Sequence, residues 1–174
     1  MITTQSVPFA KILKDSFLGQ STVRPDFIAG ETLKAVPLLA LIVGVVGATW
    51  SWRLLQWYIS ANTLTACILG TQCPLVFQTS FSYFYGVPIH MLAVAWFVLL
   101  SGLALARLYG IEKASLIGVS IGALCVPAII YLDYIQLAVI HAICSDCELA
   151  HLIGAILFVL FIIMYRSDRK SNRT

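Results

Sequence analysis

The sequence predicts an all-α integral membrane protein, a bundle of four transmembrane helices with an external cysteine-containing loop between the first two. The 174 residues are 60% hydrophobic and only 11% charged, with a mean hydropathy of +0.91. That composition is typical of chains that span a membrane. The apolar residues also gather in four long segments. We expect a helical domain over 35–166, an N-terminal tail over 1–34 that is flexible or a short interfacial helix, and a basic tail over 167–174.

The four apolar segments are long enough to cross a bilayer as helices. A helix needs roughly 20 residues to cross about 30 Å of hydrocarbon. A helix also satisfies its own backbone polar groups where no water is present. Pro127 is expected to kink the third segment, because proline has no N–H to donate. The segments cover about 36–59, 88–106, 114–143 and 147–165.

The basic residues predict how the helices are oriented. Ten of the eleven Lys and Arg residues lie in the N-terminal tail, in the link at 107–113 or in the C-terminal stretch 166–173. The positive-inside rule therefore predicts a multi-pass plasma-membrane protein with both termini in the cytoplasm. The loop at about 59–87 and the turn near 141–146 would then lie outside. The small, dispersed net charge of +3 gives no reason to expect nucleic acid, so lipid is the expected surrounding.

The charged, histidine and aromatic side chains of the predicted spans are expected to lie at the membrane interface or to pair with another polar group. Arg53 is expected to reach the interface, and His90 and His141 are expected to lie there too. Asp133, an acid inside the third span, is expected to pair with Arg53 or with a backbone group. An interfacial aromatic belt is expected at the outer end of the first helix, from Trp50, Trp52, Trp57 and Tyr58.

Four of the five cysteines share the predicted outer face. Cys67 and Cys73 lie in the external loop, and Cys144 and Cys147 form a CxxC motif where the fourth segment begins. Two such pairs are suited to exchange, in which a thiolate attacks a disulfide sulfur. A helix N-terminus favours a thiolate at Cys147, whereas the neighbouring acids Asp146 and Glu148 oppose it.

The cysteine spacing leaves other chemistry open. The same four residues would also suit two inert structural disulfides in an oxidising compartment. A four-thiolate zinc site is less favoured, because the five residues between Cys67 and Cys73 exceed the usual spacing. We favour redox chemistry without a metal. Cys125 lies in an apolar helical run, so we expect it to pack as a small hydrophobic residue.

The combined pattern resembles the vitamin K epoxide reductase family. That family tends to show, after a loop cysteine, Val-Phe or Val-Leu, then Ser or Thr, then Gly-x-Pro. The stretch CPLVFQTSFSYFYGVP places Val76, Phe77, Thr79, Gly86 and Pro88 at those positions. Ser80 departs from a frequent proline, which puts the turn of the loop in doubt. The resemblance covers about 36–165.

The resemblance implies a membrane oxidoreductase with a defined order of cysteines. Cys147 would react with a quinone such as menaquinone or ubiquinone, and Cys144 would pass the disulfide to Cys73. Cys67 would then exchange with a separate thioredoxin-like protein outside the cytoplasm. Bacterial and archaeal members, functionally similar to disulfide bond formation protein B, generate disulfides in this way. The alternatives are the reductive direction, acting on vitamin K epoxide or a quinone, and a non-enzymatic bundle with structural disulfides.

A quinone pocket is expected beside the CxxC motif. Leu132, Gln136 and Ile140 follow a four-residue spacing and share a helical face that leads to Cys144. In the loop, Phe77 and Thr79 stand at positions where the resemblance implies quinone contacts. His151 lies one turn after Cys147, where vertebrate members carry a tyrosine that contacts the quinone, so it would donate a hydrogen bond or a proton.

Overall fold

We describe residues 30–60 and 72–171 in a computed structural model, with the side chains of 30–34 and of 171 left out. The chain separates into two units, residues 1–30 and 31–174, and the description below concerns the second. Cys67 and the greater part of the predicted N-terminal tail lie outside the described residues.

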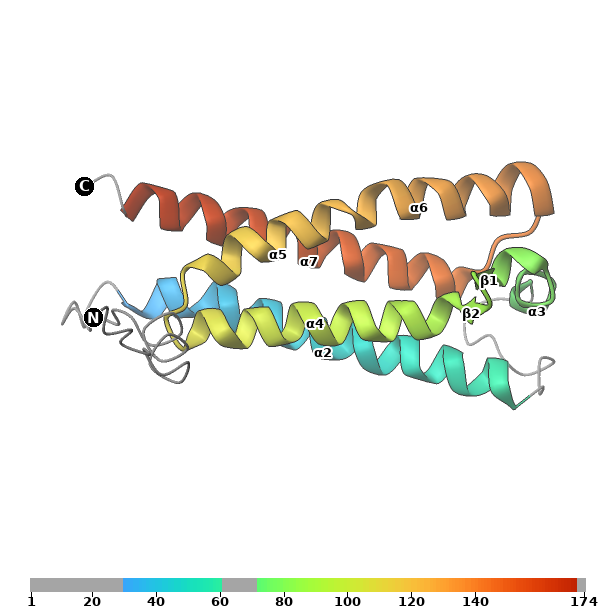
Figure 1. The fold of residues 1–174 in the computed structure, drawn as a ribbon, viewed down its shortest axis with the longest axis horizontal. Helices are drawn as coiled ribbons and strands as arrows, with labels where there is room; N and C mark the ends of the chain where they lie inside the picture. The colour runs from blue at the N-terminus through green and yellow to red at the C-terminus, as the bar shows by residue number, and fades with distance from the viewer. Residues whose placement is uncertain (1–29, 61–71, 172–174) are drawn as a thin grey trace, which may run out of the picture. The chain divides into compact units, whose positions relative to one another are not determined.

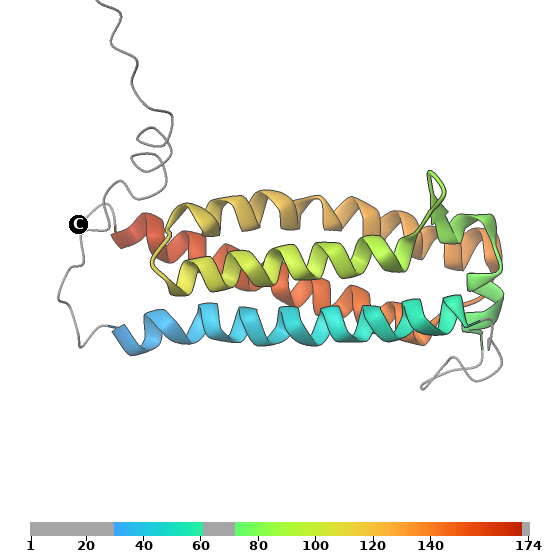
Figure 2. The ribbon, with the colours of Figure 1, turned by 60° about the horizontal axis from the view of Figure 1, so that its bottom comes forward.

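The second unit is built from four helical spans, shown side by side in Figures 1 and 2. Each contains a stretch long and apolar enough to cross a membrane. The predicted four-helix membrane bundle is therefore confirmed, and the chain fits a multi-pass membrane protein. The spans are α2 (Gly30–Ile59), α4 (Ile89–Leu108), the composite of α5 (Lys113–Ala123), α6 (Cys125–Tyr134) and η3 (Ile135–Ile140), and α7 (Ser145–Ser171).

The third span is interrupted twice. α5 ends at Ala123 and α6 begins at Cys125, where Pro127 cannot donate the hydrogen bond that the Ala123 carbonyl would otherwise accept. The segment η3 is then a π-helix that ends at His141, which is left-handed with φ 54°. The Ala142 N–H closes this segment by donating to the Gln136 carbonyl at 3.0 Å. The π-helix leads the chain out of the span and into the CxxC motif.

Small residues allow the helices to approach closely. Gly44 and Gly47 of α2 lie against Ser101 and Phe97 of α4, and Gly118 of α5 lies against Phe161 of α7. α5 packs against both α4 and α7. Phe97 and Phe161 belong to a buried apolar core, while many leucines, isoleucines and valines on the outer faces are exposed, as expected for side chains that meet lipid.

We predict that Gly118→Ala destabilises the bundle, because the added Cβ collides with the Phe161 ring. Overpacking of this kind costs roughly 1–3 kcal/mol. Thermal unfolding in detergent measures the effect. Gly102→Ala is the matched control: nothing lies within 4 Å of its added Cβ, so that variant should gain up to about 1 kcal/mol from helix propensity. Equal stability of the two variants would contradict the packing argument.

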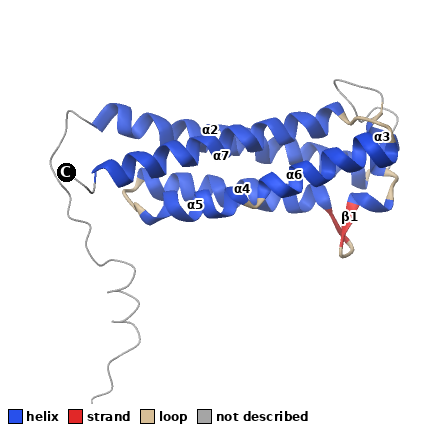
Figure 3. Cartoon of the chain, turned by 90° about the horizontal axis from the view of Figure 1, so that it is seen from above, coloured by secondary structure: helices blue, strands red, loops and turns tan. Residues whose placement is uncertain are grey.

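A short ordered segment follows residue 71. It consists of α3 (Cys73–Phe77), the 3₁₀ turn η2 (Ser80–Ser82) and the antiparallel hairpin of β1 (Tyr83–Phe84) with β2 (Val87–Pro88). Tyr85 and Gly86 both have positive φ at the tip, a conformation that glycine adopts without strain. Figure 3 shows this hairpin in red, projecting from the same end of the bundle as α3. We call this end, which also carries the start of α7, the cysteine end.

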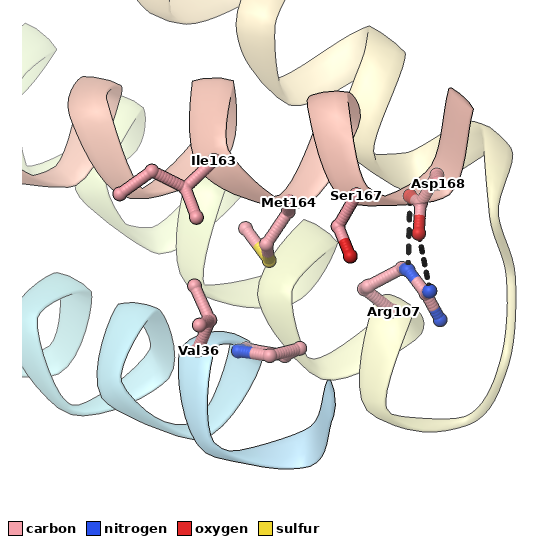
Figure 4. A pocket seen from close by; sticks show the side chains of 7 residues that line it. Val36, Arg107, Ile163, Met164, Ser167 and Asp168 are labelled. Atoms are coloured by element: carbon pink, nitrogen blue, oxygen red, sulfur yellow. Dashed lines mark hydrogen bonds and ion pairs between the residues drawn. The ribbon is translucent and has the colours of Figure 1, made fainter. Parts of the chain in front are cut away.

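A buried ion pair joins helices at the opposite end of the bundle. Arg107 at the end of α4 donates two hydrogen bonds to Asp168 of α7, and the Ser115 hydroxyl of α5 donates a third at 2.6 Å. Figure 4 shows the Arg107–Asp168 pair at the edge of a small cleft, with Val36, Ile163 and Met164 beside it. These contacts join three helices far from the cysteines.

Candidate active site at the cysteine end

The CxxC motif forms a disulfide at the start of α7. Cys144 is bonded to Cys147, with 5.2 Å between their Cα atoms. α7 begins at Ser145, so Cys144 is its N-cap: the Cys147 N–H lies 3.0 Å from the Cys144 carbonyl oxygen and 3.3 Å from its sulfur. Cys144 is fully buried and Cys147 partly so. The helix start thus presents the second sulfur of the pair and hides the first.

Cys73 lies in the same buried cluster as the CxxC motif. It begins α3 and is fully buried together with Leu54, Phe77 and Cys144. Cys73 is itself part of a disulfide. Three of the four predicted redox cysteines therefore come together, and the fourth, Cys67, lies outside the described residues. We call Leu54, Cys73, Phe77 and Cys144 the cysteine cluster.

Side-chain contacts hold α3 and α2 against the CxxC segment. The Gln72 side-chain oxygen accepts a hydrogen bond from the Ile143 N–H at 2.9 Å. The Trp50 indole N–H of α2 donates to the Asp146 carbonyl at 3.0 Å. The Cys73 sulfur lies 3.7 Å from the Asp146 Oδ2 atom. Two segments distant in sequence are thus fixed beside the disulfide.

Aromatic side chains of α2 cover the cysteine cluster. Trp50, Trp57 and Tyr58 are partly buried and pack against it, whereas Trp52 is exposed. The interfacial position predicted for these four residues stays a prediction. His90 lies within this group, with its ring centre 4.7 Å from that of Phe77.

A polar network runs along α6, η3 and α7 beside the disulfide. The Cys144 N–H donates to the Gln136 side-chain oxygen at 2.7 Å, and the Gln136 amide donates to Glu148 at 3.0 Å. Glu148 and Asp133 both face His151: their carboxylate oxygens lie 3.9 Å and 2.8 Å from its Nδ1 atom. The network connects the backbone of the first redox cysteine to a histidine one turn beyond the second.

The suggested pairing of Asp133 with Arg53 is wrong, since Asp133 meets His151. Arg53 is exposed, and its guanidinium lies 5.2 Å from the centre of the Trp57 ring. The two helices bring Asp133 and His151 together from positions 18 residues apart, which the sequence spacing does not reveal.

The other predicted pocket residues occupy mixed positions. Leu132 and Ile140 are partly buried and Gln136 is buried, whereas Leu137 and Val139 are exposed, so the three do share an inward face. The Thr79 hydroxyl donates to the Val76 carbonyl at 2.8 Å and so holds the end of α3. His141 is exposed, with Nδ1 3.1 Å from the carbonyl of Leu137.

The site also contains contacts that sequence reasoning missed. No sequence pattern pointed to Gln72, whose side chain accepts a hydrogen bond from the Ile143 N–H. Asp146 was expected to oppose a thiolate at Cys147, whereas its side chain lies against Cys73. The ligand atoms of Asp133, Glu148 and His151 lie within 4.8 Å of one another, close enough for a cation. In the structure these groups meet one another and Gln136. A Cys144–Cys147 disulfide offers no thiolate pair, so the zinc alternative gains no support.

Residues 38–162 match the family described as the vitamin K epoxide reductase family. The chain belongs to the vitamin K epoxide reductase family. The match takes in the described parts of the cysteine end and the greater part of every span. Neither a curated protein nor a solved structure matches the chain significantly. Membership makes the chain a membrane redox enzyme of a family that uses quinones in general.

Proposed function

We propose that this vitamin K epoxide reductase family member is a quinone-dependent thiol–disulfide oxidoreductase that generates disulfides. It takes two electrons from a separate reduced thioredoxin-like protein through Cys67 and Cys73. Cys144 and Cys147 then pass them to a membrane quinone. The observation that carries the proposal is the burial of Cys73 and Cys144 in one cluster beside the Cys144–Cys147 disulfide.

The exchange between the two pairs follows from this placement. The Cys73 sulfur attacks Cys144, which forms a Cys73–Cys144 bond and releases Cys147 as a thiolate. The α7 N-terminus stabilises that leaving thiolate, since Cys147 lies in the first turn. Attack of Cys67 on Cys73 then releases Cys144 and completes the transfer of the disulfide to the loop pair. Both steps conserve electrons, since each breaks one S–S bond and makes another.

The residues around Cys147 suit a quinone. Val76 and Phe77 of α3 belong to the same apolar cluster as Cys147, and His151 provides a polar group one turn beyond Cys147. Because Asp133 contacts His151 Nδ1, the His151 Nε2 atom is the one left to bond a ligand. A bound quinone would supply the oxidant, since it takes up two electrons and two protons from one dithiol. The membrane topology follows the positive-inside rule, with both termini in the cytoplasm and the cysteine end outside.

We predict that His151→Leu lowers the rate of quinone reduction by roughly 10²-fold, because the hydrogen-bond and proton donor is lost. Steady-state kinetics with varied quinone measures both kcat and KM. His141→Leu makes the same change at an exposed histidine that contacts its own helix, and it should keep the wild-type rate. Similar losses in the two variants, or none in either, would contradict the role assigned to His151.

The proposed direction is tested with purified protein in detergent. One reaction supplies a reduced thioredoxin-like protein with menaquinone or ubiquinone, and another supplies the same dithiol with vitamin K epoxide. Turnover of quinone with formation of the partner's disulfide supports the proposal. Turnover of the epoxide alone would favour the reductive direction. If neither the quinone nor the epoxide turns over, and the disulfides resist reduction, a non-enzymatic bundle with structural disulfides is favoured.

A further inference from the structure

A buried carboxylate lies against the cysteine that starts the internal exchange. The Asp146 side chain is fully buried, and its Oδ2 atom is 3.7 Å from the sulfur of Cys73, 73 positions away in the sequence. When Cys73 is reduced, this geometry suits an S–H group that donates to a carboxylate oxygen. The contact is formed by a residue inside the CxxC motif with a cysteine outside it.

The position of Asp146 is fixed from several sides. It occupies the first turn of α7, where the partial positive charge of the helix N-terminus favours a carboxylate. Its backbone carbonyl accepts the hydrogen bond from Trp50 of α2. Burial of an ionised carboxylate is otherwise costly. A carboxylate that is buried beside a thiol, on a backbone held in this way, is suited to proton transfer.

Other titratable groups at this end have different neighbours. Tyr58 of α2 and His90 of α4 face Phe77, and Glu148 of α7 faces Gln136 and His151. Among the described residues, Asp146 brings a carboxylate oxygen to 3.7 Å from the Cys73 sulfur. The proton of the Cys73 thiol therefore has a defined acceptor.

We propose that Asp146 is the catalytic base of the exchange, accepting the Cys73 thiol proton as Cys73 attacks the Cys144–Cys147 disulfide. This inference rests on the proposed function. The proton moves to Asp146 Oδ2, the Cys73–Cys144 bond forms, the Cys144–Cys147 bond breaks and the electron pair leaves on Cys147. One negative charge is present before and after the step. The buried site thus avoids a thiolate beside a carboxylate, which would repel each other strongly in a poorly solvated place.

The proposal predicts how the exchange rate depends on pH when Asp146 is present. An exchange that depends on thiolate formed in solvent slows about tenfold for each pH unit below the thiol's pKa. An exchange that moves the proton from the thiol to a neighbouring carboxylate leaves the total number of protons on the site unchanged. Its rate therefore stays nearly constant at pH values between the pKa of the carboxylate and the pKa of the thiol. We expect the Cys73 attack to change by less than about threefold between pH 6 and pH 8.

The test follows this single step in the full-length Cys67→Ala protein. Without Cys67 the exchange stops at the Cys73–Cys144 disulfide. The fully reduced protein is mixed with one equivalent of diamide, which oxidises the CxxC pair without a quinone. Samples are quenched in acid, alkylated with a maleimide and mapped by mass spectrometry, so the release of the Cys147 thiol gives the rate.

Asp146→Asn separates a base from a structural contact. The amide oxygen still accepts a hydrogen bond from Cys73, but it does not take its proton. We expect the rate at pH 6.5 to fall by about 10²-fold and to rise tenfold per pH unit, approaching the wild-type rate near pH 9. A purely structural role predicts a loss that is the same at every pH. Should the Asn variant fold poorly, the pH profile with Asp146 in place still decides.

The outcomes distinguish this inference from the proposed function. If the Cys73–Cys144 disulfide never forms at any pH, the proposed relay itself fails. If it forms at a rate that rises tenfold per pH unit with Asp146 intact, the relay stands and Asp146 is not its base. A flat profile with Asp146 and a steep one with Asn establish the base.

Discussion

Cys147→Ala should abolish quinone-linked turnover, because the cysteine that passes electrons to the quinone is lost. Without Cys147 the CxxC disulfide does not form, and Cys144 remains as a single thiol packed with Cys73 in the cysteine cluster. Electrons that reach Cys144 then have no second CxxC thiol through which to pass to a quinone. We expect a loss of at least about 10³-fold in turnover. Quinol formation with a reduced thioredoxin-like donor measures the loss.

Cys125→Ser is the control for the loss of one sulfur. Cys125 is a free, partly buried cysteine in α6, outside the cysteine cluster. This variant should turn over at close to the wild-type rate. Full activity of Cys147→Ala would show that electrons follow another path.

Arg107→Ala should destabilise the folded bundle by roughly 3 kcal/mol, because it leaves the buried Asp168 carboxylate without its cation. The two side chains are only 13% and 9% exposed, and among the described residues Asp168 keeps the side-chain hydrogen bond from Ser115. Denaturation in detergent measures the loss. The redox properties of the cysteines should not change, since the pair lies at the opposite end of the bundle.

The double variant Arg107→Met/Asp168→Leu checks the cause. Apolar side chains of similar size remove both charges together, and such replacements are often neutral. We expect the double variant to be more stable than Arg107→Ala. If the two lose equal stability, the cost comes from lost packing instead of an unpaired charge.

The spans were the part of the fold that sequence predicted well. Hydropathy marks a segment because roughly 20 apolar residues have few alternatives to a helix in lipid. Pro127 likewise predicted the interruption of the third span, because a proline lacks the backbone N–H of a helix whatever surrounds it. The π-helix before His141 was not predicted. Gln136 within it bonds Glu148 of α7, a tertiary contact that the local sequence does not reveal.

The site was predictable in its cysteines and less so in its charges. Cysteine spacing and the surrounding motif pointed to Cys73, Cys144 and Cys147, which the structure brings together, because thiol–disulfide exchange needs cysteine sulfur. The partners of Asp133 and Asp146 depended on how two helices and α3 are rotated against one another. Asp133 consequently contacts His151 and Asp146 contacts Cys73, two pairs that sequence spacing does not predict.

The stoichiometry of quinone reduction by the reduced protein alone tests the central claim most directly. The four reduced relay cysteines are mixed anaerobically with excess quinone, and quinol is counted while alkylation maps each thiol. Two connected pairs predict two quinones reduced per chain, with all four cysteines oxidised and Cys125 still free. No quinone reduced, with thiols unchanged, would contradict the account and leave the disulfides as structural links.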